Sequence, residues 1–274
     1  MIKRFFFGAL LLLAIERLCY FQTGGFILSK MLLDTSYPST LSTVSDPFFS
    51  EPLTFIGAGK QFYAFETADH QYVVKFMKFS RRRPLPWLEK LPLPFFLHDW
   101  KTNYLAQRAK RLAHLETSSR LALNLLSEEA GLIPYIPVAK TATLIDKLGI
   151  SHRIDLSQTQ FLIQKKAVSF TDYLQQNPSE AHPLITSYLQ TLASQCHKGI
   201  CNLDPVLERN YGVAEHRMIL MDIGSLLAHP KMHSSTGIRR EIFIESLPLR
   251  DWLQRHHPKY LPYFDAELKK QTAP

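Results

Sequence analysis

Three short fragments of the sequence contain residues that could handle a phosphate group and a divalent cation. They are Ile56-Gly57-Ala58-Gly59-Lys60, then Val73-Val74-Lys75, and then the stretch from Asn202-Leu203-Asp204 through Asn210 to Asp222-Ile223-Gly224. Glycines let backbone amides approach a phosphate closely, a strand lysine supplies positive charge, and carboxylate and amide oxygens suit Mg²⁺. Each fragment alone is weak evidence for a phosphate and metal site. The order of the three fragments along the chain is the informative feature.

Short strands are predicted around the first two fragments. Between Leu53 and Phe79, three strand-like runs are separated by turns at Gly57-Ala58-Gly59 and Ala68-Asp69-His70, a pattern typical of an antiparallel meander. Side chains alternate along a strand, so Lys75 and Lys78 lie on opposite faces of the third run. We expect Lys75, 18 residues after Gly57 (75 minus 57), to point beneath the glycine turn.

Helical and strand-like patterns follow the meander. Apolar residues recur at helical spacing from about Trp100 to Ala130, which predicts one long helix or two short ones ending before Gly131. Further strands are expected within 135–148 and 160–165, which makes five in all. The second half is mainly helical and ends in two predicted helices, 238–247 and 249–255. The pattern therefore indicates an α+β protein.

The stretch between the third strand and the long helix has an unusual composition. Arg81-Arg82-Arg83 is followed by four prolines and several aromatic residues. Proline disfavours a regular helix or a central strand, so this stretch is predicted to be an insertion. It could contact an acidic membrane or a partner, or it could be a packed surface loop.

With its fragments in this order, the chain resembles the protein-kinase-like superfamily, which includes small-molecule and lipopolysaccharide kinases as well as protein kinases. The resemblance covers roughly residues 53–226. It implies a two-lobed protein-kinase-like fold, with a five-stranded N-lobe over 53–168 and a short helical C-lobe over 169–274. It also implies ATP and Mg²⁺ as cofactors.

The resemblance assigns nucleotide binding to residues of the N-lobe. Backbone amides at Gly57 and Gly59 would face the phosphates, although Phe62 stands where the family has a third glycine. Lys75 would contact the α and β phosphates and pair with a glutamate of the following helix. We select Glu116 for that pairing over Glu128 and Glu129, which lie close to the predicted helix end.

The resemblance assigns the chemistry to the C-lobe. Asp204 would accept the proton of the acceptor hydroxyl, and Asn210 and Asp222 would hold the metal. The chain departs from the family pattern in three ways. Asn202 replaces a histidine, Leu203 replaces an arginine, and the interval from Asp204 to Asn210 (210 minus 204, six) is one residue longer than usual. These departures leave catalytic competence open.

The short C-terminal part limits the range of acceptors. Only 52 residues follow Asp222 (274 minus 222), and they contain no Ala-Pro-Glu segment. There is little room for the peptide-docking helices of a protein kinase. We therefore expect an atypical kinase acting on a small-molecule, sugar or lipid-linked hydroxyl. The alternatives are a pseudokinase that binds a nucleotide or a protein, and a membrane-associated interaction protein with coincidental kinase-like fragments.

The composition of the chain limits the classes of partner and metal site that we expect. The 274 residues carry a net charge of +8, which favours phosphate, an acidic lipid surface or an acidic partner. No nucleic-acid-binding motif is present, so nucleic acid is not expected as a partner. The three cysteines cannot supply a disulfide framework, and Cys196, His197 and Cys201 lack a second ligand pair at zinc-like spacing.

The N-terminus has the composition of a signal or anchor. Lys3 and Arg4 precede an apolar run from Phe5 to Ile15, while Glu16 and Arg17 interrupt the longer segment that would be needed to cross a bilayer. We expect residues 1–30 to be a signal-like or membrane-surface segment and residues 31–52 a linker; a buried helix is the alternative. The protein is thus expected at a membrane, with its body in an ATP-containing compartment.

Overall fold

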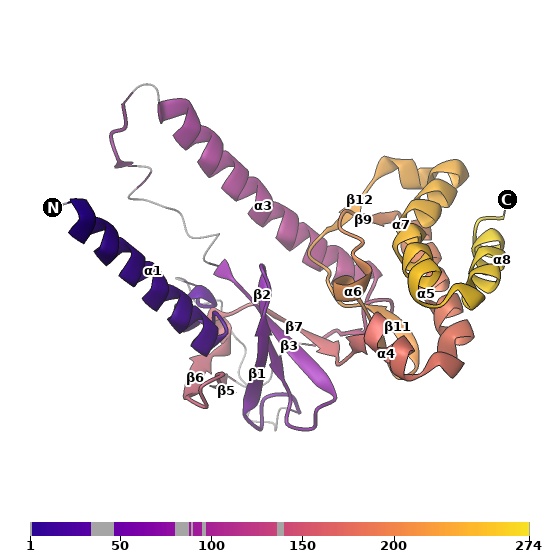
Figure 1. The fold of residues 1–274 in the computed structure, drawn as a ribbon, viewed down its shortest axis with the longest axis horizontal. Coiled ribbons are helices and arrows are strands. Elements are labelled where there is room, and N and C mark those ends of the chain that lie inside the picture. The colour runs from indigo at the N-terminus through magenta and orange to yellow at the C-terminus, as the bar shows by residue number, and fades with distance from the viewer. Residues whose placement is uncertain are drawn as a thin grey trace. The chain divides into compact units, whose positions relative to one another are not determined.

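The computed structural model of the chain describes residues 2–33, 47–79, 88, 90–94, 97–135 and 140–273 (Figure 1). Most of the predicted linker and the arginines and first prolines of the predicted insertion lie outside these residues. The chain divides into two compact units, which we describe separately. The first unit comprises Met1–Lys101 and Tyr135–Ile163, and the second comprises Thr102–Pro134 and Gln164–Pro274.

The first unit contains most of a seven-stranded sheet with the order β4-β7-β3-β2-β1-β5-β6. The antiparallel pairing of β1 with β2 and of β2 with β3 confirms the predicted meander, and β1 also pairs with β5 in parallel. The strands of this unit are β1 (Leu53–Ala58), β2 (Phe62–Glu66), β3 (Tyr72–Met77), β5 (Thr141–Ile145) and β6 (Ser151–Asp155). β7 (Phe161–Lys165) begins in this unit and ends in the second, which contains β4 (Leu132–Ile133).

The sheet therefore has two strands more than the five that were predicted. The predicted strand regions correspond to β1, β2, β3, β5 and β7. β4 has only two residues, too few for a visible period, and the sequence of β6, Ser-His-Arg-Ile-Asp, is polar except for one buried isoleucine. Both strands are held by their neighbours in the sheet rather than by strong propensity of their own.

Aromatic side chains form the core of the first unit. Phe26, which follows helix α1 (Ile2–Thr23), lies 5.2–5.6 Å from the rings of four neighbours. These neighbours are Phe55, Tyr63, Phe65 and His152. Such tilted and edge-on pairs are favourable for aromatic rings, so the short segment after α1 is fixed to the sheet.

The second unit is mainly helical. A single helix, α3 (His98–Leu125), which starts at the end of the first unit, resolves the choice between one long helix and two short ones. The other α-helices described in this unit are α4 (Phe170–Gln176), α5 (Ala181–His197), α6 (Leu207–Asn210), α7 (Ser235–His256) and α8 (Leu261–Gln271). The prediction of two helices over 238–255 is wrong, because α7 continues through Pro248.

Two small sheets lie between these helices in the chain. β8 (Val168–Ser169), β10 (Tyr211–Ala214) and β11 (Arg217–Leu220) form one, and β9 (Ile200–Asn202) and β12 (Leu226–Ala228) form the other. The β10–β11 hairpin turns at Glu215 and His216, both at positive φ. The residues before and after this hairpin, Asn210 and Asp222, are thereby brought back to the same end of it.

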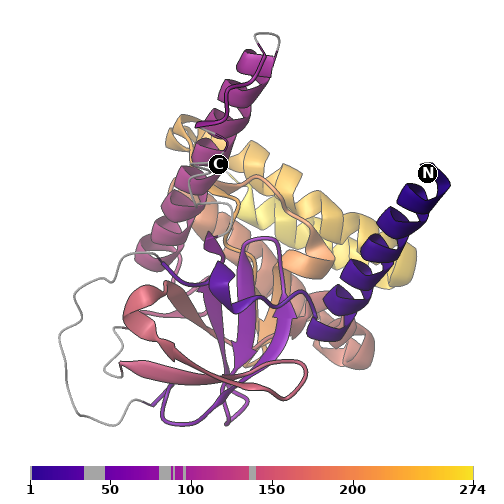
Figure 2. The same cartoon turned by 90° about the vertical axis from the view of Figure 1, so that its left-hand side faces the viewer.

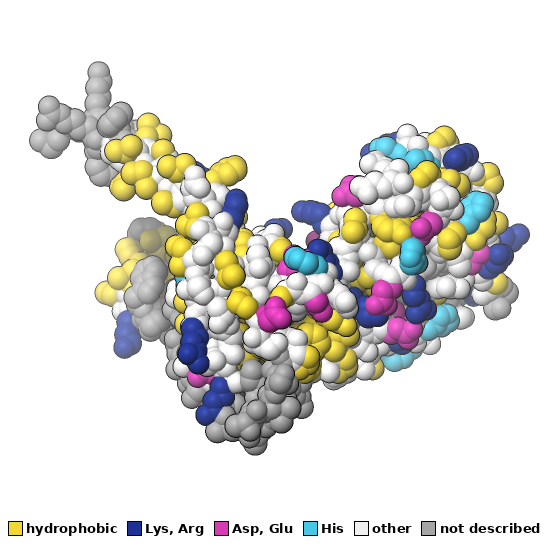
Figure 3. Space-filling model, turned by 90° about the horizontal axis from the view of Figure 1, so that it is seen from below, with side chains coloured by type: hydrophobic (Ala, Val, Ile, Leu, Met, Phe, Trp, Pro, Cys, Tyr) yellow, Lys and Arg dark blue, Asp and Glu magenta, His cyan; other side chains and the backbone are white. Residues whose placement is uncertain are grey.

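The surface seen in Figure 3 mixes positive and negative side chains. Lysines and arginines are interspersed there with aspartates and glutamates, so the excess of positive charge does not form a single stripe on this face. Among the described helices, none combines the length and the apolar character needed to cross a membrane.

Candidate functional site

The structure brings Asp204, Asn210 and Asp222 together in the second unit. The buried Asn210 donates its side-chain amide to the backbone carbonyl of Asp204. Its own backbone carbonyl accepts from the amides of Met221, at 2.7 Å, and of Asp222, at 3.4 Å. Because the amide nitrogen of Asn210 faces Asp204, its amide oxygen, the atom that could bind a metal, is directed away from that carbonyl.

Asp222 closes the turn that follows β11. Its Oδ1 accepts from the Gly224 amide at 2.9 Å, an Asx-type contact that fixes the side-chain rotamer. The second carboxylate oxygen, Oδ2, is then the group that could bind a ligand from this half-buried position. The turn thus presents one carboxylate oxygen in a defined direction.

The residue that connects these loops is Asn202, at the end of β9. Its Oδ1 accepts from the Asp204 amide at 3.0 Å and from the Ser225 hydroxyl at 2.6 Å. The Leu203 amide also donates to the Ser225 carbonyl at 3.0 Å. Asn202 therefore joins the loop of Asp204 to the turn of Asp222, although the sequence indicated only that it replaces a histidine.

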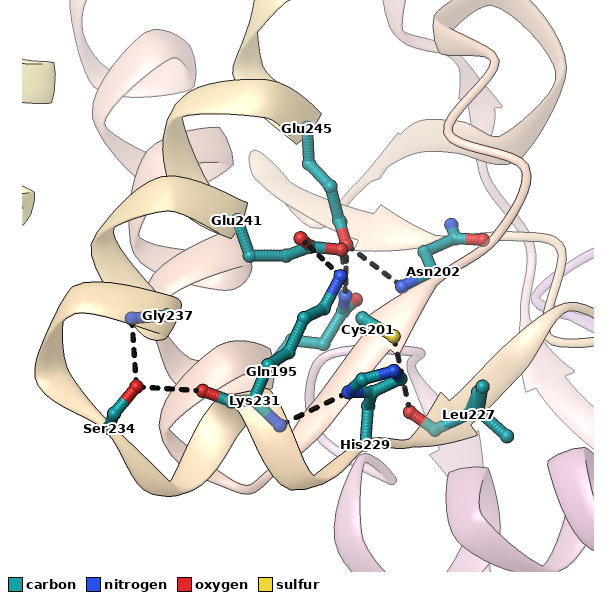
Figure 4. Close-up of polar contacts among 10 residues, drawn as sticks. All are labelled: Gln195, Cys201, Asn202, Leu227, His229, Lys231, Ser234, Gly237, Glu241 and Glu245. Atoms are coloured by element: carbon teal, nitrogen blue, oxygen red, sulfur yellow. Dashed lines mark hydrogen bonds and ion pairs between the residues drawn. The ribbon is translucent and has the colours of Figure 1, made fainter.

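A glutamate of α7 contacts the backbone of Asn202 (Figure 4). The Asn202 backbone amide donates to Glu245 Oε1 at 2.8 Å, and Gln195 of α5 donates to both carboxylate oxygens of Glu245, at 3.1 and 3.3 Å. Glu245 is 1% exposed, and burial raises its pKa to about 7 against the opposing effect of these hydrogen bonds. No sequence pattern pointed to Glu245, which lies 43 residues from Asn202.

Helix α3 fixes the Asp222 turn from another direction. The hydroxyl of the fully buried Ser118 donates to the Ile223 carbonyl and accepts from the Leu226 amide at 2.8 Å. A single side chain thus satisfies two backbone groups on either side of the turn. Ser118 lies more than 100 residues from its partners and was not identified from the sequence.

We expect Ser118→Ala to lower the free energy of unfolding by about 2 kcal/mol, because it leaves a buried carbonyl and a buried amide without their partner. Urea denaturation measures this change. Ser119→Ala is the matched control, since Ser119 is also buried but its hydroxyl has no hydrogen-bond partner among the described residues. Equal losses in the two variants would contradict the role given to Ser118.

The three glutamates considered as the partner of Lys75, which are Glu116, Glu128 and Glu129, all lie in the second unit. Glu116 is half-buried on α3, two residues before Ser118. Glu129 is buried and accepts from Ser194 and Lys198 of the α5 region. Burial alone would raise the Glu129 pKa, but these two hydrogen bonds outweigh it and lower that pKa. Glu128 is exposed and pairs with Arg217 at 3.6 Å.

Lys75, Gly57 and Gly59 lie in the first unit. Lys75 is half-buried on β3 and stands opposite Ala64 of β2 in the sheet register. Lys78 is used locally, since its ammonium donates to the Gly59 carbonyl at 2.6 Å and lies 3.9 Å from the centre of the Tyr63 ring. The hydrogen bond to Gly59 ties the glycine turn to the end of β3. The roles of Lys75 and the two glycines in phosphate binding stay predictions.

Gly57 and Gly59 have free space at the position where a side chain would begin. A Cβ atom added to Gly57 would meet nothing within 4 Å, and one added to Gly59 would meet only the Phe62 carbonyl, at 3.8 Å. Neither glycine has a positive φ. The fold of the first unit therefore does not require glycine at these positions, whereas close approach of an external group to the backbone would.

The donor set of the second unit suits Mg²⁺. Asp222 offers a carboxylate oxygen and Asn210 an amide oxygen, both hard donors, and Mg²⁺ commonly takes its remaining ligands from water and substrate phosphates. Within the described part of the chain, no cluster of three or more His, Cys, Asp or Glu residues could hold a metal by itself. A site of this kind would depend on a bound phosphate to complete it.

No protein-family model and no curated protein matches the chain. Among solved structures, the chain is similar to a co-crystal structure of WbdD with the kinase inhibitor LY294002, at 17% identity and a TM-score of 0.33, over 79% of this chain and 45% of that chain. It is also similar to a structure of the bifunctional kinase-methyltransferase WbdD, at 17% identity and a TM-score of 0.37, over 77% and 42% of the two chains. This chain spans less than half the length of either. Because these TM-scores are low, we base the proposed function on the site's own residues.

Proposed function

We propose that the protein is an atypical kinase that transfers a phosphoryl group from ATP to the hydroxyl of a small molecule, sugar or lipid-linked acceptor. The observation that carries this proposal is the hydrogen-bond network around Asn202 and Asn210, which joins Asp204 to the turn of Asp222. A base and a metal-binding pair on one connected set of loops is what phosphoryl transfer to a hydroxyl requires. The need for ATP implies a nucleotide-containing compartment.

Each residue has a definite task in the proposed reaction. The acceptor oxygen attacks the γ-phosphorus, the bond between that phosphorus and the β-phosphate oxygen breaks, and the hydroxyl proton passes to the Asp204 carboxylate. Asn210 and Asp222 would hold Mg²⁺, which when bound neutralises charge on the phosphates. Lys75 and the amides at Gly57 and Gly59 are assigned to the donor phosphates, and Glu116 to the orientation of Lys75.

Binding and transfer can be measured separately. We expect ATP with Mg²⁺ to raise the thermal unfolding temperature and labelled γ-phosphate to appear on a hydroxyl compound from a panel of sugars, polyols and lipid-linked saccharides. The absence of any thermal shift with ATP, with and without Mg²⁺, would overturn the proposal. Neither readout depends on knowing the natural acceptor in advance.

A second candidate is a pseudokinase that binds nucleotide without transfer. The observation that favours it is Leu203, which is 58% exposed next to Asp204 where the family has an arginine. A leucine cannot supply the positive charge that the family has at this position. A thermal shift with ATP but no transfer to any acceptor, and no ATP hydrolysis, would favour this candidate over the active kinase.

Gly57→Ala is expected to weaken nucleotide binding about tenfold without loss of stability. The added methyl group meets no atom of the protein, so it harms only the approach of an external phosphate. Isothermal titration with ATP and Mg²⁺ measures the affinity, and thermal unfolding without nucleotide measures the stability. Unchanged affinity would show that this backbone does not contact phosphate.

A further inference from the structure

Helix α1 is attached to the first unit by its C-terminal end. The Lys147 ammonium donates to the Phe21 carbonyl at 2.9 Å. Just beyond the helix, the Tyr63 hydroxyl donates to the Gly25 carbonyl and accepts from the Ile27 amide, both at 3.1 Å. The helix extends from this base away from the sheet, and its N-terminus lies at the far end (Figure 2). The base of α1 is thus fixed to the β2 and β5–β6 region.

Residues 10–13 of α1 are exposed and apolar on every side of the helix. Leu10, Leu11, Leu12 and Leu13 are consecutive and are 61%, 52%, 69% and 59% exposed. Successive residues of an α-helix are about 100° apart, so these four side chains point in four directions around the axis. A groove on another protein, or on a second copy of this chain, would cover one side and leave the others in water. Lipid hydrocarbon can surround the helix completely.

A second apolar feature lies beside the base of α1. The tip of the β5–β6 hairpin carries Leu148 and Ile150, which are 51% and 52% exposed. Their neighbour Lys147 makes the contact with Phe21, which is itself 77% exposed. The hairpin tip and the end of α1 therefore offer apolar side chains at neighbouring points of the same unit, although they are far apart in sequence.

The charge of the segment complements an anionic surface. Residues 1–33 contain four Lys or Arg (Lys3, Arg4, Arg17, Lys30) and one Glu (Glu16), a net charge of +3 (4 minus 1). Lys147 adds an exposed cation at the hairpin tip. Basic residues next to an inserted apolar segment are attracted to the negative charge of an anionic leaflet.

We propose that α1 and the tip of the β5–β6 hairpin insert together into an anionic lipid surface. α1 enters the hydrocarbon, while Leu148 and Ile150 contact the interfacial region beside its base. The hairpin is a second, independent contact, and two such signals give more durable attachment than one. This arrangement also fixes the first unit against the lipid surface, because the base of α1 is attached to this unit and the hairpin is part of its sheet.

The test uses the 274-residue chain and vesicles of phosphatidylcholine with or without phosphatidylglycerol. Cys19 is an exposed residue of α1, whereas Cys196 and Cys201 are buried, so Cys19 can be labelled selectively with an environment-sensitive dye. We expect a blue shift of the dye emission on addition of vesicles, and tighter binding when phosphatidylglycerol is present. A blue shift that depends on protein concentration without vesicles would indicate self-association instead and would overturn the proposal.

Substitutions separate the two contacts. Leu148→Asp with Ile150→Asp is expected to weaken vesicle binding about tenfold, since two interfacial apolar side chains become charged. Phe243→Asp is the matched control, because Phe243 is 50% exposed on α7 of the second unit and should leave binding unchanged. Unchanged binding of the hairpin variant would refute a role for the hairpin. A matching loss in the Phe243 control would do so as well.

Discussion

Asp222→Asn is expected to reduce phosphoryl transfer about 100- to 1,000-fold or more while the protein stays folded. The substitution keeps the size of the side chain and an oxygen that can still accept from the Gly224 amide, so the turn is retained. It removes the negative charge that would hold Mg²⁺ against the phosphates. Transfer is measured with labelled ATP on the best acceptor of the panel, and folding by thermal unfolding.

Asp251→Asn is the control for this substitution. Asp251 is an exposed residue of α7, and the same change of charge there should leave transfer intact. A dependence on Mg²⁺ concentration that is shifted upward in the Asp222→Asn protein would further identify the lost group as a metal ligand. Full turnover by Asp222→Asn would exclude Asp222 from the metal site and with it the proposed mechanism.

The sequence predicted the structure best where the candidate site residues lie next to β-strands. The strand-like runs between Leu53 and Phe79, separated by two turns, indicated the meander of β1, β2 and β3. The order of Asp204, Asn210 and Asp222 indicated one site, and the β10–β11 hairpin brings Asn210 and Asp222 to the same end of it. These features depend on local propensity and short-range pairing, which sequence patterns record.

The supporting residues could not be predicted in the same way. Ser118 and Glu245 act on the loops of Asp222 and Asn202 through contacts that span 105 and 43 residues of sequence. A buried serine on a long helix, or a glutamate on α7, has no local pattern that distinguishes it from a solvated residue. Ser118 and Glu245 reach their partners only because the helices pack against the small sheets. A short stretch of sequence does not show which residues will meet through such packing.

Glu245 gives the stability of the protein a specific dependence on pH. Its pKa is about 7 in the folded chain, well above the ordinary value of 4.5, because burial disfavours the ionised carboxylate. The charged and polar groups that face it come from five elements around it. They are Glu241 of α7, Lys231 of the 3-10 turn before α7, Tyr188, Gln195 and Cys196 of α5, Cys201 and Asn202 of β9, and Tyr211 of β10.

The direction of the effect follows from proton uptake. Between pH 4.5 and about pH 7 the folded protein keeps the Glu245 proton while the unfolded chain has released it, so unfolding becomes easier as pH rises through this window. The contribution of Glu245 is complete below pH 4.5, is lost by about pH 7, and amounts to roughly 3 kcal/mol. Other titrating groups, such as Glu129, add their own pH dependence to the total.

Glu245→Gln isolates this contribution, because glutamine cannot ionise and its side-chain oxygen can still accept from the Asn202 amide. Urea denaturation of both proteins from pH 5 to pH 8 should show the wild-type protein losing stability relative to the variant as pH rises, by about 1.4 kcal/mol per pH unit at most. Above about pH 7, where the buried carboxylate is ionised, the difference should level off. Parallel curves would mean that Glu245 does not change ionisation between the folded and unfolded states. In that case the carboxylate that accepts from the Asn202 amide is ionised over the whole pH range measured. Glu245→Gln would then weaken this hydrogen bond at every pH.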